Sequence, residues 1–365
     1  MHRATRASLH RRRGFIKVKA VTVAPRAAGS IRFDDVPEPD VSTGSILVEA
    51  VAVGICGTDV EIASGAYGWA PPGRERLILG HESLGRVLDP GPHGELRTGD
   101  LIVGIVRRPD PVPCPNCAVG EWDMCRNGQY TERGIKQIDG FMSERWRIEP
   151  GFYTKMDPTL GVLGVLLEPT TVVTKAWEQV AAMRARAFWE PRTVLVTGAG
   201  PIGLLAALLG VQLGLEVHVL DRASSGRKPR LVHDLGATYH SGSVTDIGLE
   251  PDVIIECTGV GQVIVDSIRQ VGAGGVVCLT GVGTGGRTTG LPAADVATEL
   301  VLQNNVIVGS VNANRRHFYR AAEALSAADR DWLGQLITRR VPPQDITAAL
   351  HRGPDDIKVI VEFGT

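Results

Sequence analysis

The sequence lacks the features of several protein classes. Its 39 basic and 40 acidic residues leave a net charge of −1, which gives no excess charge for binding nucleic acid or an anionic membrane. No apolar run reaches the roughly 18 residues of a membrane-spanning helix, and the longest, 202–214, predicts a buried helix. What remains is an ordinary globular composition, 43% hydrophobic and 22% charged, on a chain of 365 residues that is long enough for two domains.

Cysteine is also scarce, and half of it is clustered. Of six cysteines, Cys114, Cys117 and Cys125 lie within twelve positions, which favours metal binding over disulfides. Cys257 and Cys278 lie in apolar runs and are expected to be buried small side chains. This usage predicts a reduced, cytoplasmic setting.

The first 17 residues form a basic extension. Arg12 and Arg13 resemble a twin-arginine export signal. Such a signal also needs an apolar stretch of roughly 7–15 residues, whereas Lys19 and Arg26 interrupt the apolar residues after the arginine pair. We therefore expect no export, and a folded domain that begins at Val18.

The composition and the pattern of apolar runs change twice along the chain. Residues 18–175 are rich in glycine, proline and short β-branched runs, typical of strands joined by loops. Residues 176–310 alternate strand-like and helix-like runs, which predicts a parallel sheet with helices on both faces, an α/β doubly wound Rossmann domain. Residues 311–365 return to the first pattern, with a helix near 316–327 and a strand near 358–363. A discontinuous catalytic domain around a cofactor domain explains this order. The strands expected in the cofactor domain are 193–196, 216–220, 253–256, 275–280 and 306–308.

A glycine-rich turn, Gly198-x-Gly200-x-x-Gly203, comes after the first of these strands and opens the apolar helix. The first glycine permits the tight turn, the second lets a pyrophosphate approach the backbone, and the third lets the helix pack on the strand. The helix that starts at Pro201 and Ile202 directs free N–H groups at the anion. Dinucleotide binding is expected, and a glycine turn without a ligand is the alternative.

Asp221 ends the second expected strand, eighteen positions after Gly203. A carboxylate there accepts hydrogen bonds from both ribose hydroxyls and repels a 2′-phosphate, so NAD is the expected cofactor. Arg222, Arg227 and Lys228 come next in the chain and would offset that repulsion, so use of NADP stays open. The alternative interpretation is that these basic residues form a solvated loop without a role in cofactor binding.

Metal-binding side chains occur in two further glycine-rich segments. Cys56 lies in 54–59 (GICGTD), and His81 and Glu82 lie in 80–85 (GHESLG). Thiolate, imidazole and carboxylate are suitable zinc ligands, and a catalytic zinc keeps one position open for substrate. A lone cysteine or histidine is more often a buried side chain without a metal. The prediction of a catalytic zinc therefore rests on the joint occurrence of these segments and the nucleotide turn.

From Val18 onward, the chain resembles the zinc-containing medium-chain dehydrogenase/reductase family, for which the Gly-His-Glu motif at 80–82 is highly specific. Short segments resemble the glucose 1-dehydrogenase group within it: 106–109, 132–135, 140–144, 168–169 and 309–312. The resemblance implies a Rossmann domain and a mostly β, GroES-like catalytic domain. It also implies a homodimer or homotetramer joined at an edge strand of the cofactor domain.

By this resemblance, Cys56, His81 and Glu168 surround a catalytic zinc, with Glu82 either a ligand or directly behind the ligands. Thr58 matches the family's proton-relay hydroxyl. Zinc lowers the pKa of a bound C1 hydroxyl, and the proton leaves through Thr58. Hydride then passes to the nicotinamide, and an aldonolactone forms.

The same resemblance assigns substrate contacts to Glu132, Glu168 and Asn312, and Asn312 is also a candidate contact of the cofactor. A carboxylate that accepts two sugar hydroxyls forms charge-assisted hydrogen bonds. The alternative for Glu132 is a salt bridge with Arg107 or Arg133.

Two positions depart from the family pattern. Glu61 stands where many relatives carry a histidine that continues the proton relay. Val172, four positions after Glu168, stands where glucose enzymes commonly have a polar residue that contacts the sugar. A zinc-dependent polyol or secondary alcohol dehydrogenase is therefore the alternative to an aldose dehydrogenase. A zinc-free reductase and a non-catalytic binding protein are disfavoured by the metal, relay and nucleotide residues.

Cys114, Cys117 and Cys125 reproduce three of the four cysteines of the family's structural-zinc lobe, about 110–126. The first cysteine would fall at Pro111, which cannot bind a metal. Because a structural zinc normally has four protein ligands, a carboxylate has to complete the site. The candidates are Asp110, Glu121 and Asp123. A lobe of reduced thiols without metal is the alternative.

Overall fold

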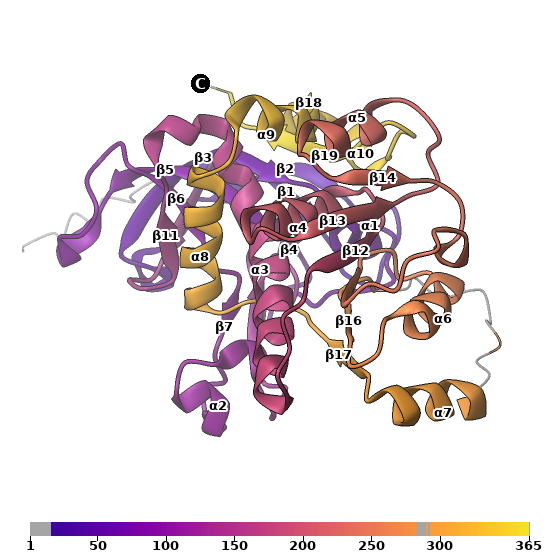
Figure 1. The fold of residues 1–365 in the computed structure, drawn as a ribbon. Helices are drawn as coiled ribbons and strands as arrows, with labels where there is room; N and C mark the ends of the chain where they lie inside the picture. The colour runs from indigo at the N-terminus through magenta and orange to yellow at the C-terminus, as the bar shows by residue number, and fades with distance from the viewer. Residues whose placement is uncertain (1–15, 283–289, 291–292, 365) are drawn as a thin grey trace, which may run out of the picture.

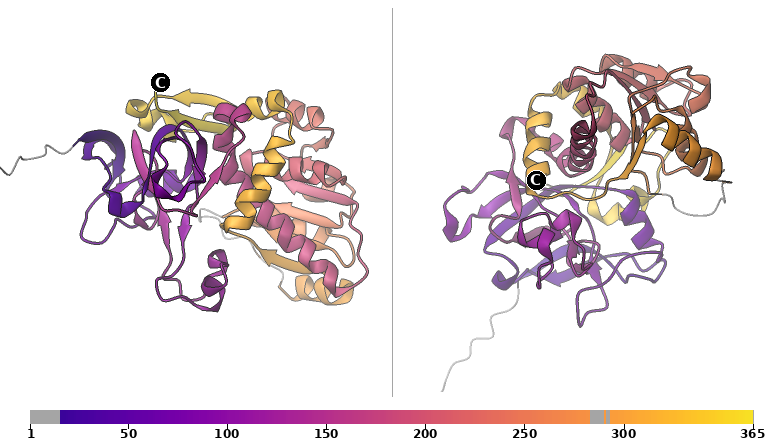
Figure 2. Two further views of the ribbon diagram at one scale, coloured as in Figure 1. Left: turned by 90° about the vertical axis from the view of Figure 1, so that its left-hand side faces the viewer. Right: turned by 60° about the horizontal axis from the view of Figure 1, so that its bottom comes forward.

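The computed structural model describes residues 16–282, 290 and 293–364. Arg12 and Arg13 of the basic extension lie outside the described residues. Figures 1 and 2 show two domains, one formed by the first and last parts of the chain and the other by the middle part. Within the described residues, no helix is long and apolar enough to cross a membrane.

The β-rich domain is built around a sheet with the strand order β11-β6-β5-β3-β19-β18, and β10 pairs with β3. Its strands are β3 (Ile46–Gly54), β5 (Glu82–Asp89), β6 (Leu101–Gly104), β10 (Arg145–Ile148), β11 (Tyr153–Lys155), β18 (Ile337–Val341) and β19 (Lys358–Glu362). β19, from the end of the chain, pairs antiparallel with β3 from its first part. This pairing confirms the discontinuous catalytic domain.

Smaller sheets and short helices complete this domain. One sheet contains β1 (Lys17–Val23), β2 (Arg32–Pro37) and β4 (Leu77–Ile78), and another contains β7 (Arg107–Arg108), β8 (Thr131–Arg133) and β9 (Gln137–Ile138). The helices are α1 (Gly57–Ala63), α2 (Pro115–Ala118), α8 (Arg315–Ser326), α9 (Arg330–Leu336) and α10 (Ile346–Leu350). The 3₁₀ segments of the described chain are η1 (Val41–Thr43), η2 (Gly91–His93), η3 (Trp122–Met124), η4 (Pro158–Leu166), η5 (Met183–Arg186), η6 (Val244–Asp246) and η7 (Pro343–Asp345).

The middle domain has a parallel sheet with the order β14-β13-β12-β15-β16-β17. Its strands are β12 (Thr193–Thr197), β13 (Glu216–Leu220), β14 (Thr238–His240), β15 (Val253–Glu256), β16 (Val276–Leu279) and β17 (Val306–Gly309). Its helices are α3 (Leu167–Ala182), α4 (Pro201–Gln212), α5 (Arg227–Asp234), α6 (Gly261–Gln270) and α7 (Ala293–Gln303). The strand order reverses beside β12, which is where doubly wound sheets bind their ligands.

Both faces of the inner strands β12, β13, β15 and β16 are buried, which explains their continuous apolar runs. Val194 and Val196 of β12 face the core formed with α3 and α4, whereas Leu195 faces a second cluster with Ile254 and Val277. The expected strands 216–220 and 253–256 coincide with β13 and β15, and the others differ by one residue at one or both ends. The predicted Rossmann fold is confirmed.

Helix α3 joins the two domains. It runs through the expected boundary between residues 175 and 176 and packs against α4 and α8, and Figure 1 shows α3 and α8 side by side. Glu168, Val172 and Lys175 are spaced i, i+4 and i+7, so they share one face of α3. After β17, residues 310–314 return the chain to the catalytic domain, where α8 begins.

Candidate active site

The nucleotide turn requires glycine at two of its three glycine positions. Gly198 has a φ of +93°, which favours glycine. A Cβ on Gly203 would lie 1.7 Å from the carbonyl oxygen of Gly198, so the first turn of α4 requires glycine there. A Cβ on Gly200 would meet nothing within 4 Å. The space beside Gly200 is therefore available to a ligand at the N-terminus of α4, which starts at Pro201 and Ile202.

Asp221, at the end of β13, is fixed beside this turn. Its carboxylate accepts hydrogen bonds from the backbone N–H of Ala199 at 2.8 Å and of Ala223 at 3.1 Å, and Lys228 Nζ lies 3.1 Å from both oxygens. Burial opposes its ionisation, but these donors outweigh burial and lower the pKa of Asp221. Lys228 thus offsets the charge of Asp221, whereas the neighbouring Arg222 is exposed.

Cys56, His81 and Glu82 form a cluster at one end of β3 and β5. Each offers a donor atom, and these atoms lie within 4.8 Å of one another. Gly54, at the end of β3, makes room for the carboxylate, because a Cβ there would stand 2.0 Å from Glu82 Oε2. Thr58 lies just beyond in α1, with its hydroxyl oxygen 3.9 Å from the sulfur of Cys56. Two separate segments of the sequence are thus brought together by the pairing of Gly54 with Glu82.

The buried carboxylate of Asp59 organises this cluster. Its Oδ2 accepts a hydrogen bond from the Cys56 backbone N–H at 2.9 Å, and its Oδ1 lies 3.4 Å from His81 Nδ1. Burial lowers the pKa of His81, but the Asp59 carboxylate outweighs it and holds that pKa well above the usual value. Asp59 is not among the predicted functional residues, although its position three residues after Cys56 is a signal for this role.

Lys358 is the other residue that the sequence did not indicate. Its amine lies 2.8 Å and 2.6 Å from the two carboxylate oxygens of Glu82, and it also donates to the carbonyl oxygen of Ile55 at 3.2 Å. Lys358 begins β19 and is 276 positions from Glu82, so only the β19–β3 pairing brings the two together.

Glu168 lies in the first turn of α3, near this cluster but outside the group of donors within 4.8 Å. Among the described residues, no hydrogen bond to its side-chain carboxylate is present. Burial raises the pKa of Glu168 to about 7, with His81 and Lys358 opposing and Glu82 reinforcing the rise. A partly buried carboxylate without a donor, beside a thiol and an imidazole, fits a divalent zinc ion.

Glu132 and Asn312, the predicted substrate contacts, touch each other. Asn312 Nδ2 donates to Glu132 Oε1 at 2.7 Å. Arg107 donates to the same oxygen from Nε at 3.0 Å and forms a salt bridge from its NH2 nitrogen at 2.9 Å. The alternative pairing of Glu132 with Arg107 is therefore present, whereas Arg133 pairs with Glu149. No described residue donates a hydrogen bond to the other oxygen, Oε2, which leaves that oxygen free to accept from a ligand.

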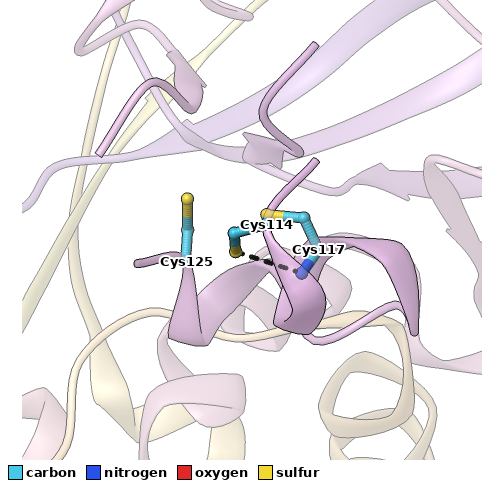
Figure 3. A group of neighbouring side chains, drawn as sticks. All are labelled: Cys114, Cys117 and Cys125. Carbon is cyan, nitrogen blue, oxygen red and sulfur yellow. Dashed lines mark hydrogen bonds between the residues drawn. The ribbon is translucent and has the colours of Figure 1, made fainter. Parts of the chain in front are cut away.

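The cysteine lobe projects from the catalytic domain around α2 (Figure 1), and Figure 3 shows its three cysteines together. The sulfur atoms of Cys114, Cys117 and Cys125 lie within 4.8 Å of one another. Backbone N–H groups of Arg126 and Cys117 lower the pKa of Cys114 to about 6, which favours the thiolate that zinc binds. The donor set thus fits a metal ion.

The three carboxylates of the lobe differ in their partners. Asp123 is buried, forms an ion pair with Lys175 at 2.8 Å and accepts from Asn314 at 2.7 Å. Glu121 forms a salt bridge with Arg316 at 3.1 Å. Asp110 is buried, and its Oδ2 has no hydrogen-bond partner among the described residues. Burial raises the pKa of Cys117 to about 11, and the backbone N–H of Asp110 opposes that rise. Asp110 is therefore the carboxylate with a free oxygen beside the cysteines.

Comparison with known proteins agrees with this geometry. Residues 161–363 match the family model for the glucose dehydrogenase C-terminus, and residues 42–158 match that for the alcohol dehydrogenase GroES-like domain. This chain belongs to the glucose dehydrogenase group of the zinc-containing medium-chain dehydrogenases. The family predicted from the sequence is confirmed.

Curated relatives and solved structures support the assignment over nearly the whole chain. Glucose 1-dehydrogenase of Methanocella arvoryzae is 37% identical, with 95% of this chain and 100% of the relative covered. Glucose 1-dehydrogenase 1 of Caldivirga maquilingensis is 39% identical over 95% and 99%. The Haloferax mediterranei glucose dehydrogenase in complex with NADP, zinc and gluconolactone superposes with a TM-score of 0.87 at 32% identity, over 95% of this chain and 99% of that one.

Proposed function

We propose that this protein oxidises the C1 hydroxyl of an aldose, with glucose favoured, to the aldonolactone and transfers hydride to NAD or NADP. The observation that carries the proposal is the Cys56–His81–Glu82 cluster beside an unpartnered Glu168, in a chain related to glucose dehydrogenases over its length. The gluconolactone in the Haloferax structure is the corresponding product of glucose.

Cys56, His81 and Glu168 are the residues that hold the catalytic zinc in this proposal. Glu82 is already neutralised by Lys358, whereas Glu168 has no cationic partner at hydrogen-bond distance among the described side chains, so Glu168 has more to gain from a metal. When bound, zinc supplies Lewis-acid stabilisation of negative charge on the substrate oxygen.

Side chains around the cluster position the ligands and carry the proton. Asp59 orients the His81 ring and fixes the backbone of Cys56, as outer partners of metal ligands do. Thr58 accepts the proton from the substrate hydroxyl and passes it on. Glu61, one turn further along α1, replaces the histidine of many relatives as the next acceptor, or the relay ends in water.

For the cofactor, we propose that Asp221 accepts hydrogen bonds from the adenosine ribose and favours NAD, and that Lys228 and Arg222 permit NADP as well. The support is that Lys228 already balances the charge of Asp221. Asn312 lies on the segment after β17 and supplies contacts to the sugar, through Glu132, and to the cofactor.

For the sugar, we propose that Glu132 Oε2 accepts hydroxyl hydrogen bonds and that Glu168 and Asn312 supply further contacts. Val172 lies one turn after Glu168 on α3 and offers no polar atom. The aldose is therefore recognised with one hydrogen bond fewer than in a site with a polar residue there, which broadens the range of accepted aldoses.

In the lobe, we propose a second, structural zinc held by Cys114, Cys117, Cys125 and Asp110. This assignment rests on the partners of the three candidate carboxylates: Asp123 and Glu121 already pair with cations, and Asp110 has a free buried oxygen.

We also propose a homodimer or homotetramer in a reducing cytoplasmic compartment. β17 is an edge strand of the cofactor sheet, and Val301 and Leu302 of the adjoining α7 are each 75% exposed. Exposed apolar side chains beside a free strand edge favour pairing with a second copy.

The deciding experiment measures reduced-cofactor formation by purified, zinc-loaded protein with NAD or NADP, over a panel of aldoses, polyols and simple alcohols. Turnover led by glucose or another aldose, and abolished by Cys56→Ala, supports the proposal. Activity on polyols or secondary alcohols alone keeps the zinc chemistry and refutes the lactone-forming reaction.

A further inference from the structure

Asp123 lies in the cysteine lobe, on η3, two positions before Cys125. Its side chain is fully buried, yet it is outside the group of three cysteines. Its backbone carbonyl oxygen contacts Arg107, and its carboxylate contacts Lys175 and Asn314. Both sets of contacts lead to Glu132. The residue therefore has a role that the metal sites and the proposed catalytic groups do not explain.

The first connection uses the backbone of Asp123. Its carbonyl oxygen accepts a hydrogen bond from the NH1 nitrogen of Arg107 at 3.1 Å. The same guanidinium holds Glu132 Oε1 through its other two nitrogens and stacks 3.7 Å over the ring of Tyr130. Because a guanidinium is planar, fixing one nitrogen on Asp123 fixes the direction in which the others approach Glu132.

The second connection uses the carboxylate of Asp123. It holds Lys175 of α3 at 2.8 Å and Asn314 at 2.7 Å, and Lys175 also donates to the carbonyl oxygen of Val311 at 3.0 Å. Asn312 lies between these two anchored positions, with a φ of +60°, and donates to Glu132 Oε1. The segment that presents Asn312 is therefore held on both sides by Asp123 and its lysine.

Both connections lie in a protein interior, where they resist reorganisation. The side chains of Arg107 and Glu132 are 6% and 8% exposed, and those of Lys175 and Asp123 are 3% and 0% exposed. Hydrogen bonds among buried charges are stronger than in water. All donors meet Glu132 at Oε1, so the arrangement fixes Oε2 as the oxygen that faces a ligand.

We propose that Asp123 is the positioning residue of the sugar-binding carboxylate, acting on Glu132 from one side through Arg107 and from the other through Asn312. This rests on the proposed aldose dehydrogenase function. Asp123 does not contact the substrate or a metal ion; it sets the affinity for the sugar by fixing which oxygen of Glu132 accepts the hydroxyls. The cysteine lobe is thereby part of the substrate site and not only a stabilising appendage.

The test is a double-mutant cycle of Asp123→Asn and Glu132→Gln, with steady-state kinetics for the sugar and the cofactor and zinc content measured on each protein. D123N should raise the sugar KM about tenfold, the scale of one misplaced charge-assisted hydrogen bond. Its zinc content should stay at the wild-type level, because the proposed metal ligands are untouched. Its cofactor KM should rise by less than the sugar KM, because Asn312 is only one of the proposed cofactor contacts. In the E132Q background, D123N should change the sugar KM by less than about twofold, because its effect passes through Glu132.

Asp356→Asn is the matched control, since Asp356 is a similarly paired carboxylate, with Arg339 at 2.8 Å, in another part of the catalytic domain. An unchanged sugar KM in D123N overturns the proposal, and so do independent, multiplicative effects of D123N and E132Q. Loss of zinc in D123N also overturns it, because it would make Asp123 a metal ligand.

D123N keeps the backbone carbonyl that holds Arg107, so it tests the connection through Asn312. Arg107→Lys tests the connection through Arg107, also if D123N does not fold, since a lysine keeps the charge but cannot hold Asp123 and Glu132 at once. R107K should raise the sugar KM in the wild-type background and not in E132Q, and an equal rise in both backgrounds overturns the proposal. Wild-type turnover separates the two levels of inference. Without aldose activity in wild type, the proposed function and this role both fall; with it, the variants decide the role of Asp123 alone.

Discussion

The amine of Lys358 lies 2.6 Å and 2.8 Å from the two oxygens of Glu82, and both side chains are at most 2% exposed. The pair joins the last strand of the chain to the start of β5, directly behind Cys56 and His81. A lone buried charge in such surroundings would be costly, and Lys358 supplies the opposite charge beside Glu82.

Replacement of this lysine by Lys358→Met should lower the free energy of unfolding by about 3 kcal/mol in metal-free protein, because Glu82 loses the buried amine that lies within hydrogen-bond distance of both its oxygens. Added zinc should restore part of the loss by supplying positive charge beside Glu82. Urea unfolding with and without zinc measures both effects. The control is Arg340→Met, whose partner Glu362 is exposed and whose effect should stay below about 1 kcal/mol. An equal loss in both variants would contradict the special status of the buried pair.

The two glycines of the nucleotide turn should respond differently to alanine. Gly203→Ala places a methyl group against the Gly198 carbonyl oxygen and should cost about 1–3 kcal/mol of stability as well as cofactor affinity. Gly200→Ala meets open space and should cost less than about 1 kcal/mol of stability, yet weaken cofactor binding about tenfold or more by obstructing the pyrophosphate. Thermal unfolding and cofactor titration by fluorescence separate the two effects. Normal cofactor binding by G200A would show that the pyrophosphate does not bind at this turn.

Cofactor preference should depend on the pair formed by Asp221 and Lys228. Asp221→Ser removes the charge that repels a 2′-phosphate and frees Lys228 and the exposed Arg222 to attract it. We expect the ratio of kcat/KM for NADP to that for NAD to rise about tenfold or more. Lys228→Met should change the ratio in the opposite direction. If neither substitution changes the ratio, the adenosine ribose does not lie at Asp221.

The stability of the protein should fall in acid because of Glu149. Burial opposes its ionisation, but Arg108 and Arg133 outweigh burial and lower the pKa of Glu149 from 4.5 to about 2. A depressed pKa stabilises the folded state fully above about pH 4.5, and this contribution is lost as the pH falls towards 2. The side chain is 35% exposed, so solvent screening reduces the contribution to about 2 kcal/mol.

Glu149→Gln should therefore lower the free energy of unfolding at neutral pH and flatten its dependence on pH in the acidic range. Urea denaturation at a series of pH values measures this slope. Glu75→Gln, at an exposed position without a side-chain partner among the described residues, is the control and should leave the slope unchanged. An acid slope in E149Q as steep as in wild type would assign the loss to other carboxylates.

Zinc content should distinguish the two metal sites. We expect two zinc ions per chain in the wild type, with loss of one in Cys125→Ser and in Asp110→Asn and loss of the other in Cys56→Ser. C125S should lower the melting temperature, whereas C56S should abolish turnover, because only the zinc held by Cys56, His81 and Glu168 acts on the proposed substrate. Elemental analysis of dialysed protein with thermal unfolding makes the comparison. Two zinc ions per chain in D110N would show that Asp110 is not the fourth ligand of the lobe, and that Glu121, Asp123 or water takes this place.

Much of the fold could be predicted from the sequence, because the signals involved are local. Five strands of the Rossmann sheet are short apolar runs whose predicted limits agree with the structure within one residue. The sixth, β14, was not predicted, because its three residues form no apolar run. Gly198, Gly200 and Gly203 identified the nucleotide turn: the first has a positive φ, the third has a close backbone contact, and the second leaves open space for a ligand. Cys56 and His81 could be paired as metal ligands from their motifs before the β3–β5 pairing placed them together.

The tertiary structure decided the partners of the charged residues. Lys358 and Glu82 are 276 positions apart, and nothing in either neighbourhood links them. Asp110, Glu121 and Asp123 were equivalent candidates in the sequence, yet one has a free buried oxygen and the others pair with α8 or with α3. The sequence determined which groups are present and the local geometry of each. Which charges meet depends on long-range strand pairing and helix packing, because the energy of a buried charge is set by the nearest opposite charge in space and not along the chain.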